Sequence, residues 1–474
     1  MPPLACWIGK TSKVTDFTSA LVAALGGDAS RVSHGDSDRD LHSQDMSFHE
    51  PRRPDVVVYP TSTAEVSAVL ALADEHRIAV TPFGAGSSLE GHVIPQQGGI
   101  SLDLTRLDRA PDVRPDDLLA IVQAGVTRST LNAAAGEHGL WFPVDPGADA
   151  TLGGMAATNA AGTTTVRFGK MRNQVLALEA VLAGGEIIRT GTSAPKTSAG
   201  YDLTALLVGS EGTLAVITEL TVRLQGIPDH TVAARISFPD LETACTVAAA
   251  AIAAGTSVQR LELLDAATVA IVNTYQETDY PETPCLFVEA AGNRAAAVED
   301  LDLIVAFALE QGATAVVVED DPEARTTLWK ARHSVAYATS ASRPGRKHRT
   351  TDTSVPVSQL AAHAAFARSE LERAELGGGI IGHAGDGNLH VGLMLDPDDE
   401  AELAAAGSLV ERLVEDALSR GGTVTGEHGI GIGKRDALAL EHPELGALYR
   451  GIKELFDPHG IMNPGKVVSA QTSA

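Results

Sequence analysis

Apolar and polar positions alternate with two different periods along the chain, and together they predict a mixed α+β protein. The run from Val56 to Tyr59 is short, apolar and β-branched, which is typical of a buried strand. The next segment, PTSTAEVSAVLALADEHRI, has hydroxyl residues and Glu65 near its start and apolar residues at helical spacing, so it predicts a capped helix. IAVTPF then predicts a second strand. The order in this region is therefore β, α, β.

Short strands and helices continue to alternate along the rest of the chain. After Ile227 and Pro228, an Ala-rich helix, a helix beginning near Pro322 and strands at HTVAARISF, CLFVEA and ATAVVVED predict an α+β region of βαβ units. The tail begins with a helical pattern, AELAAAGSLVERLVEDALSR. Earlier in the chain, strands are expected over 99–107, 117–126, 177–184 and within 209–224, and a helix over 127–139.

The pattern divides the chain into three parts. Residues 1–50 are polar and irregular and predict a loop-rich arm rather than a packed element. We expect one domain over 51–227 and a second over 228–474, the latter with a cap at about 228–400 and a C-terminal segment at about 401–474. A chain of 474 residues is long enough for two or three such domains.

Charge and cysteine content narrow the functional classes. With 36 Lys and Arg against 61 Asp and Glu, the net charge is −25, which opposes binding to nucleic-acid phosphates. The three cysteines, Cys6, Cys245 and Cys285, form neither a disulfide framework nor a CxxC motif. The sequence lacks a signal-peptide pattern and an apolar stretch of spanning length. We therefore expect a cytoplasmic protein, at most peripheral at the inner face of a membrane.

Two clusters of small residues point to a ligand held by the backbone. Gly84, Gly86 and Gly91 follow a predicted strand, where missing Cβ atoms leave successive N–H groups free to face an anion. GAGSSLEGH is neither a Walker A loop nor the dinucleotide fingerprint. One such cluster could serve turns alone, but a second one suits the close approach of a flat polar ring. Its members are Gly153 and Gly154 with Thr158, Asn159, Ala161 and Gly162.

A separate group of residues has the composition of a metal site. His383 and His390 are seven apart in GHAGDGNLH, and the glycines between them exclude a helix, so a strand and a tight turn would have to bring them together. Asp386 and Asn388 are assigned to that turn. Two imidazoles and the carboxylate of Glu427 match the usual ligands of a catalytic zinc or similar ion. The alternative is that each histidine is simply hydrogen-bonded on a half-buried strand.

Several motifs together resemble a known flavoprotein family. PFGAGSSLEGH, FPVDPGADATLGGMAATNAAG, VRFGKMRNQVLALEAVLAGGEIIRTG and GSEGTLAVITE are similar to the FAD-binding domain of the vanillyl-alcohol oxidase and p-cresol methylhydroxylase (PCMH) type. LWKARH, GHAGDGNLH, TGEHGIGIGK and DPHGIMNPGK extend the resemblance over about 50–470. These motifs resemble the branch with D-lactate dehydrogenases (cytochrome), glycolate oxidase subunits and D-2-hydroxyglutarate dehydrogenases, and SLEGH most resembles the D-lactate dehydrogenases.

The resemblance implies a PCMH-type domain of two α+β subdomains that holds FAD, followed by an α+β substrate domain with a helical tail. Covalently flavinylated relatives carry a histidine where this chain has Ser87, so the FAD is expected to be non-covalent, and His92 is interpreted as structural. The implied FAD-binding residues are Pro82, Gly84, Ala85, Gly86, Ser87, Ser88, Pro143, Asp145, Gly153, Gly154, Asn159, Gly162, Glu211, Gly212, Ile217 and Asn463.

The resemblance also assigns roles in the second constellation. His383, His390 and Glu427 would ligate a divalent ion, Zn or Mn, and His428 would be the catalytic base. A 2-hydroxy acid can chelate such an ion, which lowers the pKa of its hydroxyl and prepares hydride transfer to the flavin. Arg332 and Lys347 are the candidates for binding the substrate carboxylate. Lys330, Arg346, His348 and Arg349 are left out of the site.

Two positions favour a short substrate. The D-2-hydroxyglutarate branch has polar side chains where this chain has Gly392 and Ala336, so partners for a distal carboxylate are missing and D-lactate is preferred. D-2-hydroxyglutarate and glycolate are the alternatives within the family. A flavin-free metal hydrolase and a silent flavin-binding subunit are the alternatives outside it. The expected electron acceptor is a cytochrome, a quinone or an electron-transfer flavoprotein, and a homodimer is left open.

Overall fold

The computed structural model describes residues 11–468, so Cys6 lies outside the described residues. Within the arm, the expectation of a loop-rich segment is wrong. Helix α1 (Thr11–Ala24) packs against α3 (Thr63–His76), and Leu21 and Leu25 are fully buried with it. The apolar residues of SALVAAL are enough to form a packed helix despite the polar residues that follow. A short helix, α2 (Asp36–Leu41), and strand β1 (Val32–Ser33) complete the arm.

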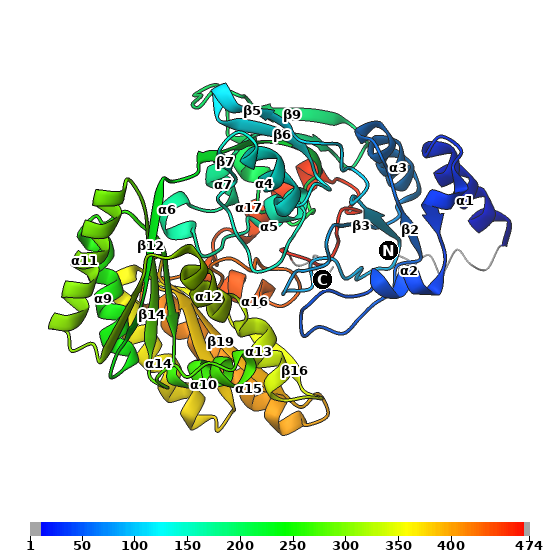
Figure 1. Ribbon diagram of the computed structural model, residues 1–474. Coiled ribbons are helices and arrows are strands. Elements are labelled where there is room, and N and C mark those ends of the chain that lie inside the picture. Colours follow the sequence, from blue (N-terminus) through cyan, green and yellow to red (C-terminus); the bar gives the residue numbers. More distant parts are fainter. Residues whose placement is uncertain (1–10, 469–474) are drawn as a thin grey trace. The chain divides into compact units, whose positions relative to one another are not determined.

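The chain forms two compact units, and each is interrupted in sequence. The first unit contains residues up to 160, residues 170–227 and residues from 427 on, and the second contains 161–169 and 228–426. One break between the units falls between residues 227 and 228, and residues from 427 on group with the first unit. Backbone contacts explain this grouping, because Met462 forms a parallel bridge to Val80. In Figure 1 the red C-terminal segment accordingly runs among the blue and cyan elements of the first unit.

The first unit contains two separate sheets. One has the order β1-β2-β4-β3, in which the last three strands are parallel and α3 follows β2, as the sequence predicts. The other is antiparallel with the order β5-β6-β10-β8-β9. The strands are β2 (Val56–Val58), β3 (Val80–Phe83), β4 (Ile100–Asp103), β5 (Asp112–Arg114), β6 (Leu119–Gln123), β8 (Val175–Val181), β9 (Ile187–Gly191) and β10 (Val216–Arg223).

Short helices and a two-stranded ladder complete the first unit. They are α4 (Arg128–Gly136), β7 (Leu140–Trp141) paired with β11 (Gln225–Gly226), α5 (Leu152–Thr158), α7 (Met171–Gln174), α8 (Leu203–Leu207), α16 (Arg435–Glu441) and α17 (Gly446–Phe456). Each sheet carries its own buried apolar cluster, one around Val122 and Leu220 and one around Val58 and Ile100. The unit therefore consists of two α+β parts.

The second unit is built on one large antiparallel sheet with the order β15-β12-β14-β13-β18-β19-β16. Strands β12 and β13 both pair antiparallel with β14, so the βαβ units expected from the sequence are split by a strand inserted between their two strands. The strands are β12 (His230–Ser237), β13 (Val258–Leu264), β14 (Cys285–Gly292), β15 (Ala315–Glu319), β16 (Lys347–Thr350), β18 (Gly378–His383) and β19 (Asn388–Leu395), with β17 (Thr353–Ser354) beside β19.

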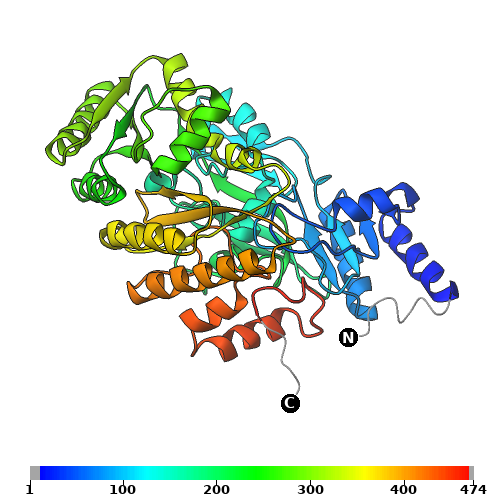
Figure 2. The same cartoon turned by 90° about the horizontal axis from the view of Figure 1, so that it is seen from below.

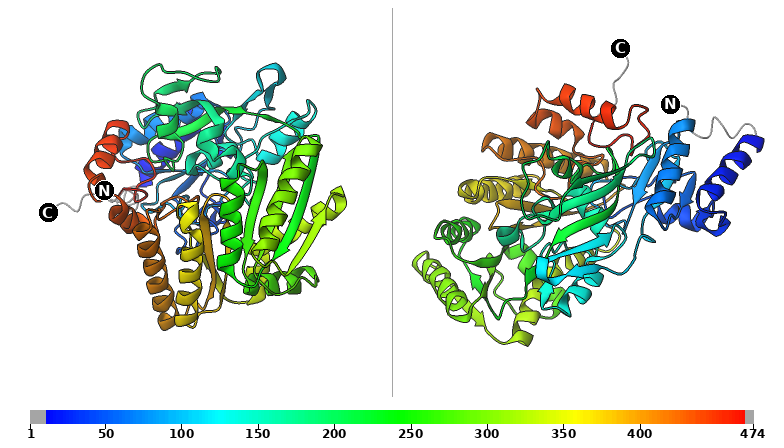
Figure 3. Two further views of the ribbon diagram at one scale, coloured as in Figure 1. Left: turned by 90° about the vertical axis from the view of Figure 1, so that its left-hand side faces the viewer. Right: turned by 90° about the horizontal axis from the view of Figure 1, so that it is seen from above.

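Helices cover both faces of this sheet. Helices α9 (Leu241–Ala253), α11 (Arg294–Glu310) and α14 (Leu360–Arg373) pack on one face, and α15 (Glu400–Ser419) lies beside α14 (Figure 2). Helices α10 (Ala266–Gln276), α12 (Pro322–His333) and α13 (Val335–Ser342) form the opposite layer (Figure 3). The one-turn helix α6 (Thr165–Phe168) packs against β13. Among the described residues, none of the helices is both long and apolar enough to cross a bilayer.

Candidate functional site

The first glycine cluster lies at the end of a parallel strand in the first unit. Gly84 directly follows β3, and a Cβ atom on it would lie 2.6 Å from Oγ1 of Thr151. Gly86 has φ +66°, a conformation that favours glycine. The loop therefore has to lack side chains at these positions, and it runs directly against the residue that precedes the second cluster.

The second cluster begins helix α5. Thr151 is its N-cap and accepts a hydrogen bond from the backbone N–H of Gly154, while a Cβ atom on Gly153 would lie 2.5 Å from Cβ of Ala124. Asn159 ends the helix with φ +52°. The two glycine clusters, 70 residues apart by the numbers of Gly84 and Gly154, thus meet in one region of the first unit.

Glu211 ties two further segments to this region. Its backbone N–H donates to the carbonyl of Ala157, and its carboxylate oxygens accept from the backbone N–H groups of Ile430 and Gly431 at 2.7 and 2.8 Å. Nε2 of His92 lies 3.2 Å from the same carboxylate. Burial raises the pKa of Glu211, but the His92 charge and these N–H groups outweigh it and hold the pKa below its usual value. The carboxylate is therefore a structural anion.

Asn463 closes the region from the C-terminal side. Its amide nitrogen donates to the backbone carbonyls of His92 and Glu211 at 3.0 and 2.7 Å, and Nζ of Lys466 donates to its Oδ1 at 2.8 Å. A Cβ on Gly212 would lie 3.0 Å from Cγ of Pro82. The expected FAD-binding residues of the first unit therefore come from several segments, namely 82–88, 143–145, 153–159, 211–217 and 463, whereas Gly162 belongs to the second unit.

His383 and His390 lie on adjacent strands of the second unit, as the glycine pattern between them predicts. Strands β18 and β19 form a hairpin whose turn includes Gly387 with φ +77°, and His390 pairs with Ile381, two residues before His383. Because alternate residues share a face of a strand, both imidazoles lie on the same face. Their ring centroids are 5.6 Å apart with an interplanar angle of 89°.

Each imidazole is oriented through Nδ1. Nδ1 of His383 lies 2.8 Å from Oε1 of Glu262, and Nδ1 of His390 lies 2.9 Å from the carbonyl oxygen of Thr351. A carbonyl oxygen and an ionised carboxylate only accept hydrogen bonds, so Nδ1 carries the proton in both rings. In the neutral rings, each Nε2 therefore keeps the lone pair that a metal ion requires.

Glu262 also binds Arg332. The Nε and Nη2 atoms of Arg332, on α12, lie 3.0 and 2.5 Å from Oε2 of Glu262, on β13. Burial raises the pKa of Glu262, but the charges of His383 and Arg332 outweigh it and lower the net pKa. Glu262 is therefore held as an anion in the interior of the second unit. The side chain expected to bind substrate, Arg332, is itself buried and oriented by it.

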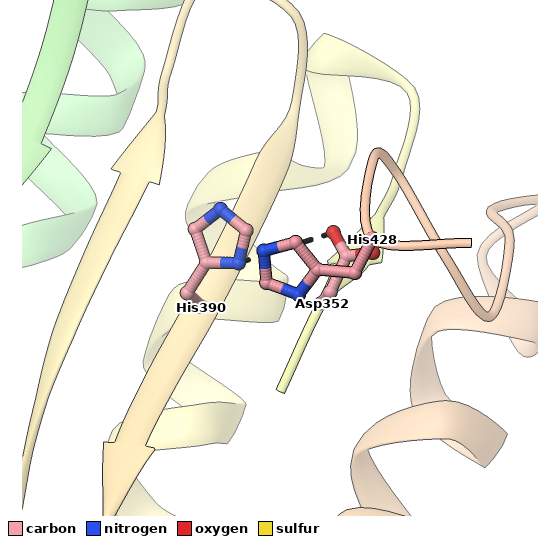
Figure 4. Close-up of side chains that lie close together, drawn as sticks. All are labelled: Asp352, His390 and His428. Atoms are coloured by element: carbon pink, nitrogen blue, oxygen red, sulfur yellow. Dashed lines mark ion pairs between the residues drawn. The ribbon is translucent and has the colours of Figure 1, made fainter. Parts of the chain in front are cut away.

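Asp352 and Asn388 extend the polar group around His390. Oδ1 of Asp352 lies 3.9 Å from Nδ1 of His390 (Figure 4) and accepts a hydrogen bond from the amide of Asn388 at 2.8 Å. The Asn388 amide also donates to the carbonyl of Thr353 at 2.9 Å. Asn388, assigned to the turn from the sequence, is thus the first residue of β19 and holds two neighbouring strands in register.

The two positions that bear on substrate size lie in different surroundings. A Cβ atom on Gly392 would lie 3.3 Å from Nε2 of His348, on β16, while Ala336 is exposed on α13. Burial lowers the pKa of His348, so a neutral imidazole faces Gly392. Lys347, the neighbouring residue expected to bind substrate, has an exposed side chain.

Glu427 and His428 follow Gly426, the last residue of the second unit, and are counted with the first. A side chain on Gly426 would collide with the amide of Asn388. Nε2 of His428 lies 3.6 Å from Oε1 of Glu427. Gly429, the next residue, could not carry a Cβ atom either, because the atom would lie 2.7 Å from Oε1 of Glu211.

Sequence reasoning missed Glu262, Asp352 and Thr351. Glu262 lies in VQRLELL, an ordinary strand pattern, 121 residues before His383, and Thr351 acts through its backbone. The one signal that the sequence offers for Glu262 is an acidic residue between the leucines of a predicted strand, because a carboxylate that such a strand buries requires a partner.

Two protein families and several known proteins are similar to this chain. The family described as FAD linked oxidases, C-terminal domain, matches residues 227–467, and the FAD binding domain family matches 54–191. A probable mitochondrial D-lactate dehydrogenase from Danio rerio is 42% identical, covering 97% of this chain and 93% of the relative. A mitochondrial D-lactate dehydrogenase (cytochrome) from Arabidopsis thaliana is 40% identical over 89% and 75%. A glycolate oxidase subunit from Bacillus subtilis is 32% identical over 90% and 92%.

Among solved structures, p-cresol methylhydroxylase with bound substrate aligns with a TM-score of 0.80 at 17% identity and covers 97% of this chain and 98% of its own. The expected α+β fold of the PCMH type is thereby confirmed, and so is the expectation of an FAD-binding domain. The expected cytoplasmic location stays a prediction, because the names of the D-lactate dehydrogenase relatives place those proteins in mitochondria.

Proposed function

Because this chain belongs to the family of FAD-linked oxidases, we propose that it oxidises a D-2-hydroxy acid, with D-lactate first and pyruvate as product. The observation that carries the proposal is the pair of histidines with anchored Nδ1 atoms in a chain 40–42% identical to D-lactate dehydrogenases. A metal-free binding protein would have no need to orient two buried Nε2 lone pairs on one sheet face.

The residues of the first unit fit non-covalent FAD. The two glycine clusters pack closely, because a Cβ atom on Gly84 would collide with Thr151 and one on Gly153 with Ala124. Backbone without side chains at the end of a strand suits the close approach of a pyrophosphate. Ser87 has no nucleophilic imidazole to attach the flavin. The backbone around Pro82, Asn159 and Gly212 would hold the ring system.

The residues of the second unit fit a divalent ion such as Zn²⁺ or Mn²⁺. His383 and His390 would supply two nitrogen ligands, and we infer that Glu427 supplies an oxygen ligand. Its position one residue after Gly426, which packs on Asn388 and Asp352, supports this assignment. Two imidazoles and one carboxylate leave coordination positions open for substrate.

When bound, the flavin supplies the electron acceptor and the metal supplies a Lewis acid for the substrate oxygens. Oxidation of the alcohol removes one proton and one hydride equivalent, and His428 accepts the proton on a ring nitrogen. Nε and Nη2 of Arg332 bind Glu262, so Arg332 would bind the substrate carboxylate through its third guanidinium nitrogen, Nη1. Lys347 adds a second positive charge. The carboxylate and the hydroxyl are thereby fixed relative to the base.

Three observations bear on the alternatives. Glycolate remains the second candidate substrate, because a glycolate oxidase subunit is similar over nearly the whole chain. Gly392 and the exposed Ala336 supply no charged partner for the distal carboxylate of D-2-hydroxyglutarate. A flavin-free hydrolase would leave the FAD binding domain match over 54–191 without a purpose.

We further infer a cytochrome as electron acceptor, which the name of the Arabidopsis relative supports. The net charge of −25 favours association with a basic partner. A quinone and an electron-transfer flavoprotein are the other acceptors that an enzyme of this family would use.

The test is an anaerobic visible spectrum of the purified protein with D-lactate, and with L-lactate, glycolate and D-2-hydroxyglutarate in parallel. A yellow protein whose flavin band bleaches fastest with D-lactate supports the proposal. Treatment with a chelator should stop the bleaching, and Mn²⁺ or Zn²⁺ should restore it. Fastest bleaching by glycolate would favour the second candidate, and a colourless protein that binds no added FAD would overturn both.

A further inference from the structure

Glu262 occupies a central position in the second unit that the proposed chemistry does not use. It lies on β13 directly opposite His383 of β18, and its side chain is fully buried. The α10, α12 and α13 layer packs on the same sheet face, where Leu264, Phe287 and Trp329 form an apolar cluster. A carboxylate in such surroundings is costly unless each of its oxygens has a strong partner.

The two oxygens of Glu262 have different partners. Oε1 lies 2.8 Å from Nδ1 of His383, and Oε2 accepts both the Nε and Nη2 donors of Arg332. One carboxylate therefore fixes the ring orientation of an expected metal ligand and the fork of the expected substrate-binding cation. The sequence separations, 121 residues to His383 and 70 to Arg332, show that only the fold brings the three together.

We propose that Glu262 is a positioning residue that links His383 to Arg332, so that metal binding and substrate-carboxylate binding depend on the same side chain. The inference rests on the proposed function. A carboxylate that accepts a hydrogen bond from Nδ1–H of a ligating imidazole makes the opposite nitrogen a better metal ligand and prevents rotation of the ring. Its second oxygen limits the guanidinium to one orientation and leaves Nη1 for a ligand.

A purely structural role predicts something different. If Glu262 served only to neutralise Arg332, its replacement would lower the stability of the unit without a selective effect on metal affinity. Glu370 on α14 provides the matched control, because it is a buried carboxylate whose ion-pair partners within the described part of the chain are Arg412 and Arg373 rather than either histidine. Glu370→Gln thus removes a comparable buried charge within the same unit.

The experiment is a Mn²⁺ titration of chelator-treated flavoprotein, in which the paramagnetic signal of free aqueous Mn²⁺ reports binding without turnover. Glu262→Gln should weaken Mn²⁺ binding about 10- to 100-fold relative to wild type. At saturating Mn²⁺ it should still raise the KM for D-lactate by about tenfold or more, because Arg332 is no longer oriented. Glu370→Gln should leave both quantities within about twofold of wild type.

Each outcome decides a separate point. Wild-type Mn²⁺ affinity in folded Glu262→Gln protein would overturn the positioning role, and weak Mn²⁺ binding with an unchanged KM would overturn the link to Arg332. If wild type itself binds no Mn²⁺, the proposed metal site fails, and this inference with it. If Glu262→Gln does not fold, Glu262→Asp is the second variant, because it keeps the charge but cannot reach both partners. It should weaken Mn²⁺ binding or raise the KM for D-lactate. If Glu262→Asp changes neither quantity, the proposal is wrong.

Discussion

Glu211 and His92 form a buried ion pair in the first unit, with Nε2 of the histidine 3.2 Å from the carboxylate. The pair comes from segments 119 residues apart and contacts a third segment through the N–H groups of Ile430 and Gly431. Because Gly429 is packed against both side chains, the pair fixes the backbone that directly follows His428. A structural ion pair thus supports the loop that carries the proposed base.

The pair should make the stability of the protein depend on pH. Burial lowers the pKa of His92, but the charge of Glu211 outweighs it and raises the net pKa, whereas the pKa of Glu211 is lowered. The stabilisation is therefore complete only above about pH 4.3 and below about pH 6.5, the values expected in the unfolded chain. It decreases as the pH rises through the folded pKa of His92 or falls through that of Glu211.

His92→Gln should therefore cost stability chiefly at mildly acidic pH, by roughly 3–5 kcal/mol, because it leaves the Glu211 carboxylate without its buried partner. Thermal unfolding of wild type and variant, measured from pH 5 to pH 9 in steps of about one pH unit, tests this prediction. The difference between wild type and variant should shrink as the pH rises. A difference that does not change with pH would contradict the ion-pair assignment.

The close packing of the first glycine cluster predicts that Gly84 cannot be replaced by a larger residue without cost. Gly84→Ala places a Cβ atom 2.6 Å from Oγ1 of Thr151, so the loop or the N-cap of α5 must move. We expect a loss of about 1–3 kcal/mol in stability and a lower flavin content per protein, measured by absorbance after gel filtration. Gly136→Ala is the control, because nothing lies within 4 Å of its Cβ atom, and it should keep the flavin.

His428→Asn should slow the proton-transfer step without changing flavin binding. The amide cannot act as a base near neutral pH, so the rate of flavin reduction by D-lactate should fall about 10²- to 10⁴-fold. Flavin content and unfolding temperature should stay near wild type, since His428 belongs to neither of the two glycine clusters. Anaerobic stopped-flow absorbance measures the rate, and unchanged reduction would exclude His428 as the base.

The acceptor prediction can be checked by ionic strength. If a basic cytochrome docks on this acidic protein, the second-order rate of cytochrome reduction should fall several-fold as the salt concentration rises from about 20 to about 200 mM. Flavin reduction by D-lactate, monitored without cytochrome, serves as the internal control and should change much less. A salt-independent rate would argue for a neutral acceptor such as a quinone.

Features of the fold and the site that depend on neighbouring residues can be predicted from the sequence, whereas those that depend on residues far apart in the chain cannot. The hairpin that carries His383 and His390 was predictable, because the glycines between them exclude a helix and a tight turn is a local feature. Helix α1 was misjudged because the polar residues after Ala24 outweighed a short apolar stretch. Glu262 was missed since its importance arises only from pairing between β13 and β18, a register that no local pattern encodes.

The return of the last residues to the first unit has a consequence for synthesis of the protein on the ribosome. Val80 pairs with Met462, and the amide of Asn463 donates to the carbonyls of His92 and Glu211, so strand β3 and the first glycine loop lack these partners until residues 462 and 463 have been synthesised. The second unit, most of which is encoded by the continuous stretch 228–426, emerges earlier and has its own large sheet. We therefore expect the N-terminal half to acquire its final order last, the reverse of the usual sequence in which domains fold as they emerge.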